Sequence, residues 1–340
     1  MINQNPIVSA VVSTYNAEFF FQKKLEDLLQ QTIANNLEII IINSGSQEAE
    51  DRIVKKYLDK YPNIKYVRTE ERESIYKAWN RGIKIASGKY ITNANTDDRL
   101  KKDAFQILST YLENNPKIAV VYADQYISNI PNQTFEEVIS SKHNKLHISP
   151  DFDYLHLLDR CLIFSQPMWR KSLHSEDNIW FDEKYEISGD YDFYFKVAQS
   201  HSFNHINIPL GVFYLSPNKE NKSHKQMEKV IAERDNVSAP YIVKYIDESV
   251  KSVLLSDFNK LRRHTFLPIP IYYILKRIIL FVNPTLVRTV YFHSIEFIYY
   301  FCIIYLNKNE QHKKAYKLLN RISRFSSSTR IKDLKKNFEK

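Results

Sequence analysis

The sequence predicts an α/β protein built on a mostly parallel β-sheet that is flanked by helices. Two observations lead to this prediction. Short runs of apolar, largely β-branched residues occur early in the chain, and Ile7–Ser13 and Leu37–Ile42 are the clearest. Runs that are apolar throughout, rather than alternating, are typical of parallel strands covered on both faces. Between these runs, stretches of about ten residues show helical spacing of apolar side chains, as the crossovers of a parallel sheet require.

The elements follow from this pattern in chain order. Apolar runs mark the strands, and apolar residues on one helical face mark the helices; in the first helix these are Phe20, Leu25, Leu28 and Leu29. The irregular, polar residues 129–165 are expected to be a loop or an insertion. The predicted strands are Ile7–Ser13, Leu37–Ile42, Ile64–Val67, Tyr90–Thr92, Ala119–Tyr122 and Leu210–Leu215; the predicted helices are Phe20–Gln31, Ala49–Tyr61, Ile75–Ala86, Lys102–Glu113, Phe193–Ala198 and Met227–Tyr245.

Composition excludes several classes of protein. The chain has 5 glycines in 340 residues, where average usage would give roughly 24. It contains neither G-x-G-x-x-G nor G-x-x-x-x-G-K-[ST], which excludes Rossmann dinucleotide binding and a P-loop. Cys161 and Cys302 lie far apart, which excludes a disulfide scaffold and a structural zinc site and suits a reducing compartment. Residues 1–6 lack the pattern of a signal peptide.

Positive charge is concentrated in the last quarter of the chain. Residues 251–340 carry 18 Lys and Arg against 5 Asp and Glu, although the whole chain has a net charge of only +9. The aromatic, apolar runs Ile271–Val282 and Val290–Leu306 are shorter or more interrupted than the roughly 20 residues that a membrane span needs. Two interpretations stay open: a helical region on an anionic membrane surface, which we favour, or a helical hairpin that packs on the rest of the chain. No motif that reads nucleic acid accompanies the charge.

Three polar segments follow predicted strands. In a parallel sheet, ligands bind beyond the carboxyl ends of the strands. The segments to consider are therefore Ser13–Asn16, Asn43–Ser46 and Asn93–Asp98. In the last of them, the adjacent carboxylates of Asp97 and Asp98 suit a divalent cation shared with a diphosphate. The alternative from these residues alone is that Asp98 caps a helix that starts near Lys101.

Five segments in order and spacing resemble the family 2 glycosyltransferases. They match the family's opening strand, its second strand and turn, its A-x-N-x-G-I helix, its metal-binding D-x-D loop and its later acidic motif. The resemblance covers roughly residues 5–235 and is much more specific than any single segment. The segments are Val8–Asn16, Leu37–Ser46, Ser74–Ile91, Asn95–Asp98 and Gly189–Phe193.

The resemblance implies a GT-A fold and an inverting transfer from a nucleotide diphosphosugar to an acceptor hydroxyl, with Mg or Mn as cofactor. Asp190 would be the base that takes the acceptor's proton, and a positioned carboxylate contributes about 10²–10⁴-fold to such a step. Other positions are implied by matching motifs. Ser13, Tyr15 and Ser44 would line the nucleoside pocket, Asn80 and Arg81 would lie near the diphosphate or sugar, Asn95 and Asp97 would bind the donor, and Asp97 and Asp98 would bind the metal.

The chain departs from the family pattern at three positions. Asn95 replaces the first Asp of D-x-D, Ser44 replaces a common acidic residue, and Gly189 replaces the Glu that often precedes the base. None of these changes removes Asp190 or Asp97. Activity is therefore expected, and a non-catalytic sugar-binding or scaffold protein is the alternative.

Residues close before or after Asp190 are candidates for acceptor binding. Aromatic rings pack against the apolar faces of sugars, so Trp169, Arg170 and Asp192 are weak acceptor candidates. The competing interpretation of Trp169 is an ordinary core aromatic. A nucleotidyltransferase is disfavoured, because Ser13–Phe21 supplies neither the glycine nor the lysine of a phosphate loop.

The sequence therefore predicts a catalytic domain at residues 1–250, with a donor half at 1–128 and an acceptor half at 129–250, followed by a basic helical region at 251–340. The expected function is sugar transfer to a glycan or lipid-linked acceptor in bacterial surface polysaccharide synthesis. The expected location is the cytoplasm, at the inner face of the cell membrane.

Overall fold

The computed structural model describes residues 5–141, 144–164, 166–217 and 228–241, with a few single residues beyond them. The chain divides into two compact units, Met1–Arg234 and Asp235–Lys340. This division falls 16 residues before the boundary expected from charge, at 250. Almost all of the predicted basic region, residues 251–340, lies outside the described residues.

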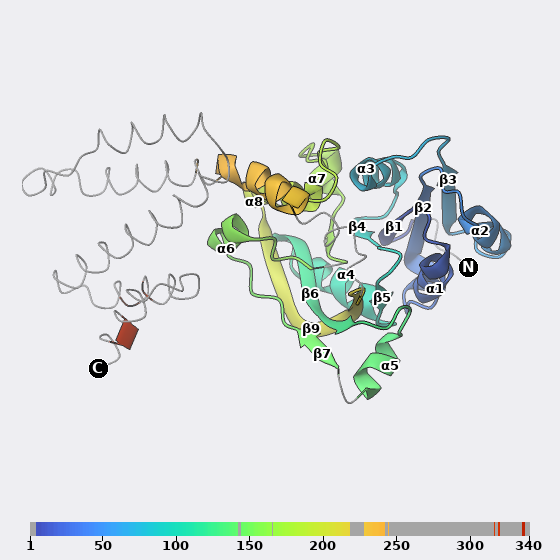
Figure 1. Cartoon of the computed structure of the whole chain (residues 1–340), viewed down its shortest axis with the longest axis horizontal. Coiled ribbons are helices and arrows are strands. Elements are labelled where there is room, and N and C mark those ends of the chain that lie inside the picture. The colour runs from blue at the N-terminus through green and yellow to red at the C-terminus, as the bar shows by residue number, and fades with distance from the viewer. Residues whose placement is uncertain are drawn as a thin grey trace, which may run out of the picture. The chain divides into compact units, whose positions relative to one another are not determined.

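The described strands form one nine-stranded mixed sheet, in the order β3-β2-β1-β4-β8-β6-β9-β5, with β7 paired to β6 (Figure 1). The first four strands of this order pair in parallel, as predicted. The short β8 then runs antiparallel between β4 and β6, and β6 pairs in parallel with β9. The strands are β1 (Val8–Thr14), β2 (Leu37–Asn43), β3 (Ile64–Arg68), β4 (Tyr90–Asn93), β5 (Arg99–Leu100), β6 (Ile118–Ser128), β7 (Lys145–His147), β8 (Met168–Arg170) and β9 (Ser202–Tyr214).

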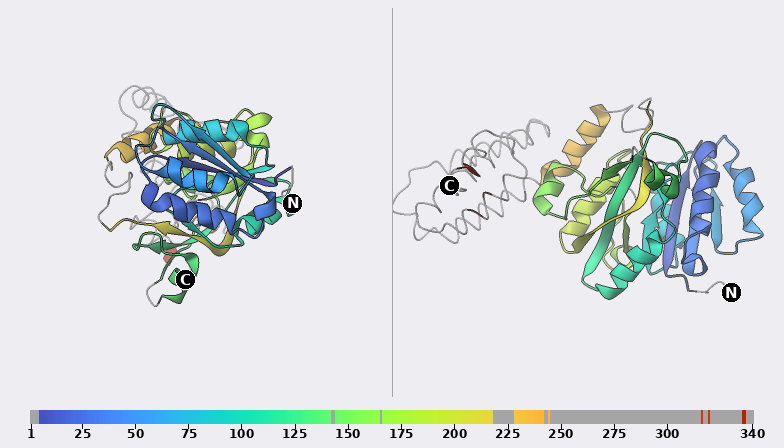
Figure 2. Two further views of the ribbon diagram at one scale, coloured as in Figure 1. Left: turned by 90° about the vertical axis from the view of Figure 1, so that its right-hand side faces the viewer. Right: turned by 90° about the horizontal axis from the view of Figure 1, so that it is seen from below.

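Helices flank the sheet, as two further views show (Figure 2). Residues 228–241 are also helical. Among the described residues, no helix combines the length and the apolar composition needed to cross a bilayer. The helices are α1 (Glu18–Leu29), η1 (Ala34–Asn36), α2 (Glu50–Leu58), α3 (Ile75–Ile85), α4 (Ala104–Asn114), α5 (Phe135–Ser140), α6 (Tyr154–Asp159), α7 (Ser172–Ser175) and α8 (Gly189–Ala198).

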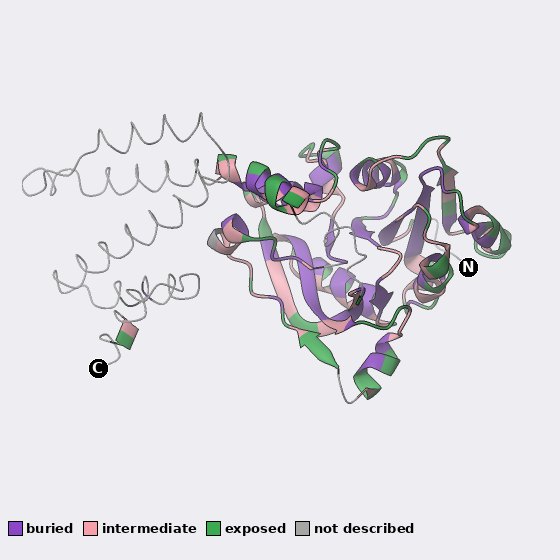
Figure 3. Ribbon diagram, viewed as in Figure 1, coloured by how far each residue is buried: buried purple, intermediate pink, exposed green. Residues whose placement is uncertain are grey.

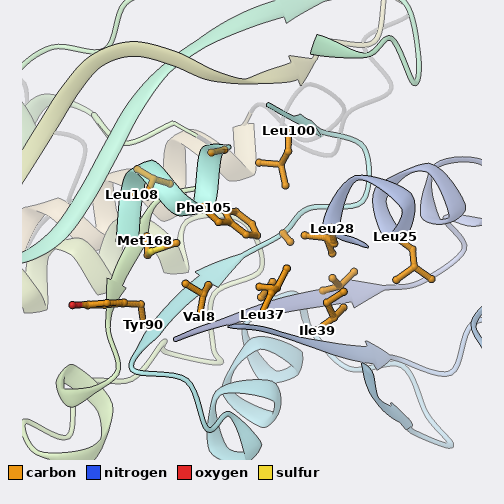
Figure 4. Packing of buried hydrophobic residues seen from close by; sticks show 14 of the residues in the cluster. Val8, Leu25, Leu28, Leu37, Ile39, Tyr90, Leu100, Phe105, Leu108 and Met168 are labelled. Atoms are coloured by element: carbon orange, nitrogen blue, oxygen red, sulfur yellow. The ribbon is translucent and has the colours of Figure 1, made fainter. Parts of the chain in front are cut away.

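Successive side chains of β1 point to opposite faces of the sheet, because side chains alternate along a β-strand. On one face, Val8 belongs to the same apolar cluster as Leu25 and Leu28 of α1 (Figure 4). On the other face, Val11 meets α3 so closely that a Cβ at Gly82 would lie 2.5 Å from its side chain. A glycine at position 82 therefore lets α3 lie directly on the sheet.

The predicted elements agree best in the first half of the chain. There β1 and β2 are almost fully buried (Figure 3), and such strands are recognisable as apolar runs. Further along the chain, β6 and β9 are eleven and thirteen residues long, far longer than predicted. Much of β9 is only half-buried and includes polar residues, so no continuous apolar run marks it. The expected loop at 129–165 contains the short elements α5, β7 and α6.

Candidate active site

The carboxyl ends of β1, β2 and β4 meet at one edge of the sheet. Thr14 at the end of β1 pairs with Asn43 at the end of β2. On the other side of β1, Val11 pairs with Asn93 at the end of β4. The three polar segments predicted from the sequence therefore leave neighbouring strands at the same edge.

The turn after β2 is held by its own side chains. The Asn43 side-chain oxygen accepts a hydrogen bond from the backbone N–H of Ser46 at 2.9 Å. Gly45 has a φ of +66°, and a Cβ there would lie 3.0 Å from a backbone oxygen, so this turn requires glycine. Ser44 is buried in the turn, whereas Ser13 on β1 is half-buried. The structure places both at the predicted edge, and their contacts with a donor remain predictions.

Tyr15 lies just beyond β1 with a half-buried side chain. The Arg72 guanidinium carbon is 4.2 Å from the centre of the Tyr15 ring, which is within the range of a cation–π contact. The sequence did not identify Arg72, because it lies in a loop outside the recognised segments. This pair offers an aromatic face and a positive charge at the site where the nucleoside pocket is predicted.

The Asn95–Asp98 segment is a loop, and Asp98 does not cap a helix. The next helix, α4, begins at Ala104. The buried Asp98 carboxylate instead accepts hydrogen bonds from the Tyr214 backbone N–H at 3.2 Å and from the Asn95 amide at 3.3 Å. The capping alternative is therefore wrong: Asp98 ties the loop to the end of β9.

Lys24 of α1 also supports this loop through hydrogen bonds. Its side chain is 0% exposed, and its ammonium donates to the Asp98 backbone oxygen at 3.1 Å and to the Gln166 side-chain oxygen at 2.7 Å. Burial lowers the Lys24 pKa to about 8, while the charges of Asp98, Asp27 and Asp97 oppose this shift. The buried amine thus gives the acidic loop a nearby positive charge.

Asp97 and Asn95 have the chemistry to hold a divalent cation. Asp97 is half-buried, and burial raises its pKa, so its charged form lacks full compensation. The side-chain oxygens of Asn93 and Asn95 are buried without a hydrogen-bond partner among the described residues. Hard cations take carboxylate and amide oxygens together. The described residues contain no cluster of three or more acidic, His or Cys ligands, so such an ion would also need oxygens of the substrate.

Asp190 lies in the first turn of α8 and is half-buried. Its carboxylate accepts hydrogen bonds from the Tyr191 backbone N–H at 2.8 Å and from the Tyr76 hydroxyl at 3.3 Å. Burial, with a smaller contribution from the charge of Glu233, raises the Asp190 pKa to about 6. A carboxylate with this pKa is ionised at neutral pH and is still basic enough to take a proton.

Gly189 and Tyr76 form a close contact beside this carboxylate. A Cβ at Gly189 would lie 2.7 Å from the Tyr76 ring, so no side chain fits there. Burial holds the pKa of Tyr76 well above its ordinary value, and the hydroxyl therefore remains a donor. The absence of an acidic residue at position 189 thus has a steric reason in this chain.

Glu233 is a further acidic residue near Asp190, and no sequence motif identified it. It lies in the helical residues 228–241, and its carboxylate accepts backbone hydrogen bonds from Glu186 at 3.0 Å, Ile187 at 2.9 Å and Ser188 at 2.9 Å. These contacts span 45 to 47 residues of sequence. A local sequence pattern cannot predict a contact between residues so far apart in the chain.

Asn80 and Arg81 of α3 are each engaged with other parts of the protein. The Asn80 amide donates to the Phe181 backbone oxygen at 2.9 Å and to Glu183 at 3.0 Å. Arg81 makes two hydrogen bonds to Glu73, at 2.5 and 3.0 Å. Asn80 therefore joins α3 to the segment that precedes Asp190, and the donor contacts expected of both residues remain predictions.

The structure corrects the expectation that Trp169 and Arg170 face an acceptor. Trp169 of β8 is 1% exposed, and its indole donates to His174 at 2.7 Å. Arg170 is occupied with three backbone carbonyl oxygens of the segment at 112–118. The core interpretation of Trp169 is therefore the right one. Asp192 is buried and paired with Lys196 at 2.7 Å.

Comparison with known proteins agrees with this geometry. Residues 9–166 match the family model described as glycosyl transferase family 2. An uncharacterized glycosyltransferase of Methanocaldococcus jannaschii is 27% identical over 64% of this chain and 73% of its own length. The minor teichoic acid biosynthesis protein GgaB of Bacillus subtilis is 27% identical over 54% of this chain, but that match covers only 20% of GgaB. The hyaluronan synthase of Pasteurella multocida is likewise 27% identical, over 61% of this chain and 20% of the synthase.

Solved structures share the fold. The S. aureus TarS fragment 1–349, crystallised with UDP-GlcNAc, gives a TM-score of 0.52 at 16% identity, covering 71% of this chain and 72% of that fragment. The complex of the same fragment with UDP gives 0.50 at 18% identity, covering 78% and 77%.

The curled mixed sheet with its flanking helices is a GT-A fold, and the family match together with the named relatives supports glycosyltransferase activity. Residues 9–166 match glycosyl transferase family 2, and the named relatives of this part of the chain are glycosyltransferases or proteins of polymer synthesis.

Proposed function

We propose that this protein is an inverting glycosyltransferase that moves a sugar from a nucleoside diphosphate sugar to a hydroxyl of a glycan or lipid-linked acceptor in bacterial surface polysaccharide synthesis. The observation that carries the proposal is Asp190, a half-buried carboxylate with a pKa raised to about 6. It lies in the first turn of α8, where its Tyr191 and Tyr76 hydrogen bonds fix its position.

In the proposed reaction, Asp190 takes the proton of the acceptor hydroxyl as its oxygen attacks the anomeric carbon. The bond from that carbon to the diphosphate oxygen breaks, and its electron pair leaves with the nucleoside diphosphate. Because attack and departure occur on opposite faces of the carbon, the configuration inverts. An alcohol is a weak nucleophile at neutral pH, so the base contributes about 10²–10⁴-fold.

The donor would bind at the edge formed by β1, β2 and β4. Tyr15 with Arg72 above its ring supports nucleobase binding, and Ser13 and Ser44 lie at the same edge. The side-chain oxygens of Asp97 and Asn95 would hold a Mg or Mn ion. When bound, such an ion neutralises charge on the leaving diphosphate.

The printed names of the similar proteins indicate which substrates to test first. TarS was crystallised with UDP and with UDP-GlcNAc, and GgaB is named for minor teichoic acid biosynthesis. We therefore propose UDP-sugars as the first donors to test and polymers of the cell envelope as the first acceptors.

The decisive experiment replaces Asp190 by Asn. Transfer is expected to fall about 10²–10⁴-fold because the amide cannot take a proton, while calorimetry should show unchanged donor binding. Asp177→Asn, which alters an exposed carboxylate elsewhere, is the matched control and should retain full activity. Wild-type turnover by the Asp190 variant would overturn the assignment of the base. A wild-type protein that binds nucleotide sugars without transfer or hydrolysis would favour the non-catalytic alternative.

For residues 251–340 we propose attachment to an anionic membrane surface on the cytoplasmic side. This proposal is supported by their 18 basic residues against 5 acidic residues and by their aromatic, apolar runs. The full chain should sediment with vesicles that contain phosphatidylglycerol at low salt, and less so at high salt. Equal partitioning to neutral and anionic vesicles would contradict this proposal.

A further inference from the structure

The segment that precedes α8 is organised by one carboxylate from a distant helix. Three successive backbone N–H groups, at Glu186, Ile187 and Ser188, donate to Glu233. The N-cap residue of α8, Ser188, makes no capping hydrogen bond through its side chain. Glu233 therefore satisfies backbone donors just before the start of the helix, where local side-chain capping is absent.

Both backbone polar groups of Ile187 in this segment form hydrogen bonds to side chains. Its N–H donates to Glu233, and its carbonyl oxygen accepts the Tyr76 hydroxyl at 2.5 Å. The same hydroxyl reaches Asp190, and Gly189 lies against the Tyr76 ring. Any displacement of this backbone would carry Asp190 with it.

We propose that Glu233 is a positioning residue for Asp190, which fixes the backbone before the base and places a negative charge beside it. The proposal rests on the proposed function, in which Asp190 is the base. Glu233 does not contact the reacting atoms in this scheme. It acts through residues 186–188 and Tyr76.

The electrostatic part of this role follows from the groups that face Asp190. Among the described residues they include Tyr76 of α3, Tyr194 of α8, Cys161 and Glu233. Glu233 is an acidic member of this set; burial is the main cause of the raised Asp190 pKa, and the charge of Glu233 adds a smaller contribution in the same direction. Like charges near a carboxylate favour its protonated form and so make it a stronger base.

Two substitutions separate position from charge. Glu233→Ala removes the acceptor of all three N–H groups, and kcat is expected to fall about 100-fold through misplacement of the base, with donor KM little changed. Hydrogen exchange of the amides at 186–188 should become faster. Glu233→Gln can still accept from Ile187 and Ser188, which share one carboxylate oxygen. It should keep most of the exchange protection but move the acidic limb of the pH–kcat profile to lower pH.

Lys229→Gln is the matched control, because Lys229 lies on the same helix and pairs with Glu186 of the same segment at 2.6 Å. This exposed pair should contribute little, so the control should keep wild-type exchange, kcat and pH profile. Unchanged exchange at 186–188 in Glu233→Ala would overturn the positioning role, whatever the reaction. An unshifted pH limb in Glu233→Gln would overturn the electrostatic role. If Asp190→Asn is fully active, the base assignment fails instead, independently of the exchange result.

Discussion

The proposed donor edge, where β1, β2 and β4 end, and the surroundings of Asp190 are built in different ways. At the donor edge, the side chains extend from the ends of adjacent parallel strands, so strand pairing alone brings Thr14 beside Asn43. Around Asp190, the position depends on side chains from distant parts of the chain, which are Tyr76 and Glu233. The first arrangement follows from the sheet, whereas the second follows from individual hydrogen bonds.

The two regions should therefore respond differently to the substitution of a single side chain. A strand end keeps its place when one side chain is changed, because the backbone ladder holds it. The segment before α8 has no such ladder, and the loss of one carboxylate frees three backbone donors. Substitutions at the donor edge should therefore change chemistry with little change in structure, and those around Asp190 should change both.

The largest expected effect at the donor edge is that of Asp97→Ala. Transfer should fall about 100- to 1,000-fold, because the site would lose the carboxylate that holds the cation, and with it the positive charge that would stabilise the leaving diphosphate. The residual activity should no longer respond to EDTA or to added Mn. Asp59→Ala, which changes an exposed carboxylate near the end of α2, should behave as wild type. Full, metal-stimulated turnover without Asp97 would show that this edge does not hold the cation through it.

The next effect is the dependence of transfer on pH. Asp190 acts in its ionised form, and burial raises its pKa to about 6. The value of kcat/KM should therefore be level near pH 7 and fall about tenfold per unit below pH 6. A limb near pH 4, the ordinary range of Asp, would mean that the base is a more exposed carboxylate.

The smallest expected effect on turnover is that of Trp169→Phe. The variant loses the indole donor to His174 and should be less stable by about 1 kcal/mol. Its acceptor KM should equal that of the wild type, because the ring is buried in the core. Thermal denaturation and initial-rate kinetics give the two measurements. A raised acceptor KM with unchanged stability would restore Trp169 as an acceptor residue.

The shared edge of the polar strand ends was easier to predict from the sequence than the surroundings of Asp190, for the same structural reason. Buried strands such as β2 are apolar runs, so their polar ends at Asn43 and Asn93 are visible in the sequence. The contact of Tyr76 with Asp190 and that of Ser188 with Glu233 join residues 114 and 45 positions apart. Trp169 was ambiguous because an aromatic residue near a base suits both a sugar platform and a core, and only burial distinguishes them.

The short strand β8 has a consequence for the order of folding. Trp169 pairs with Ile91 on one side and with Val120 on the other, so β8 joins the two parallel parts of the sheet. Contacts at such separations form late, because a long loop must close before they stabilise anything. During synthesis, β1 and β2 can pair long before Tyr214 and Glu233 emerge from the ribosome. A nascent chain should therefore form the edge at β1 and β2 first, and should hold Asp190 in its final position only near the end of the domain.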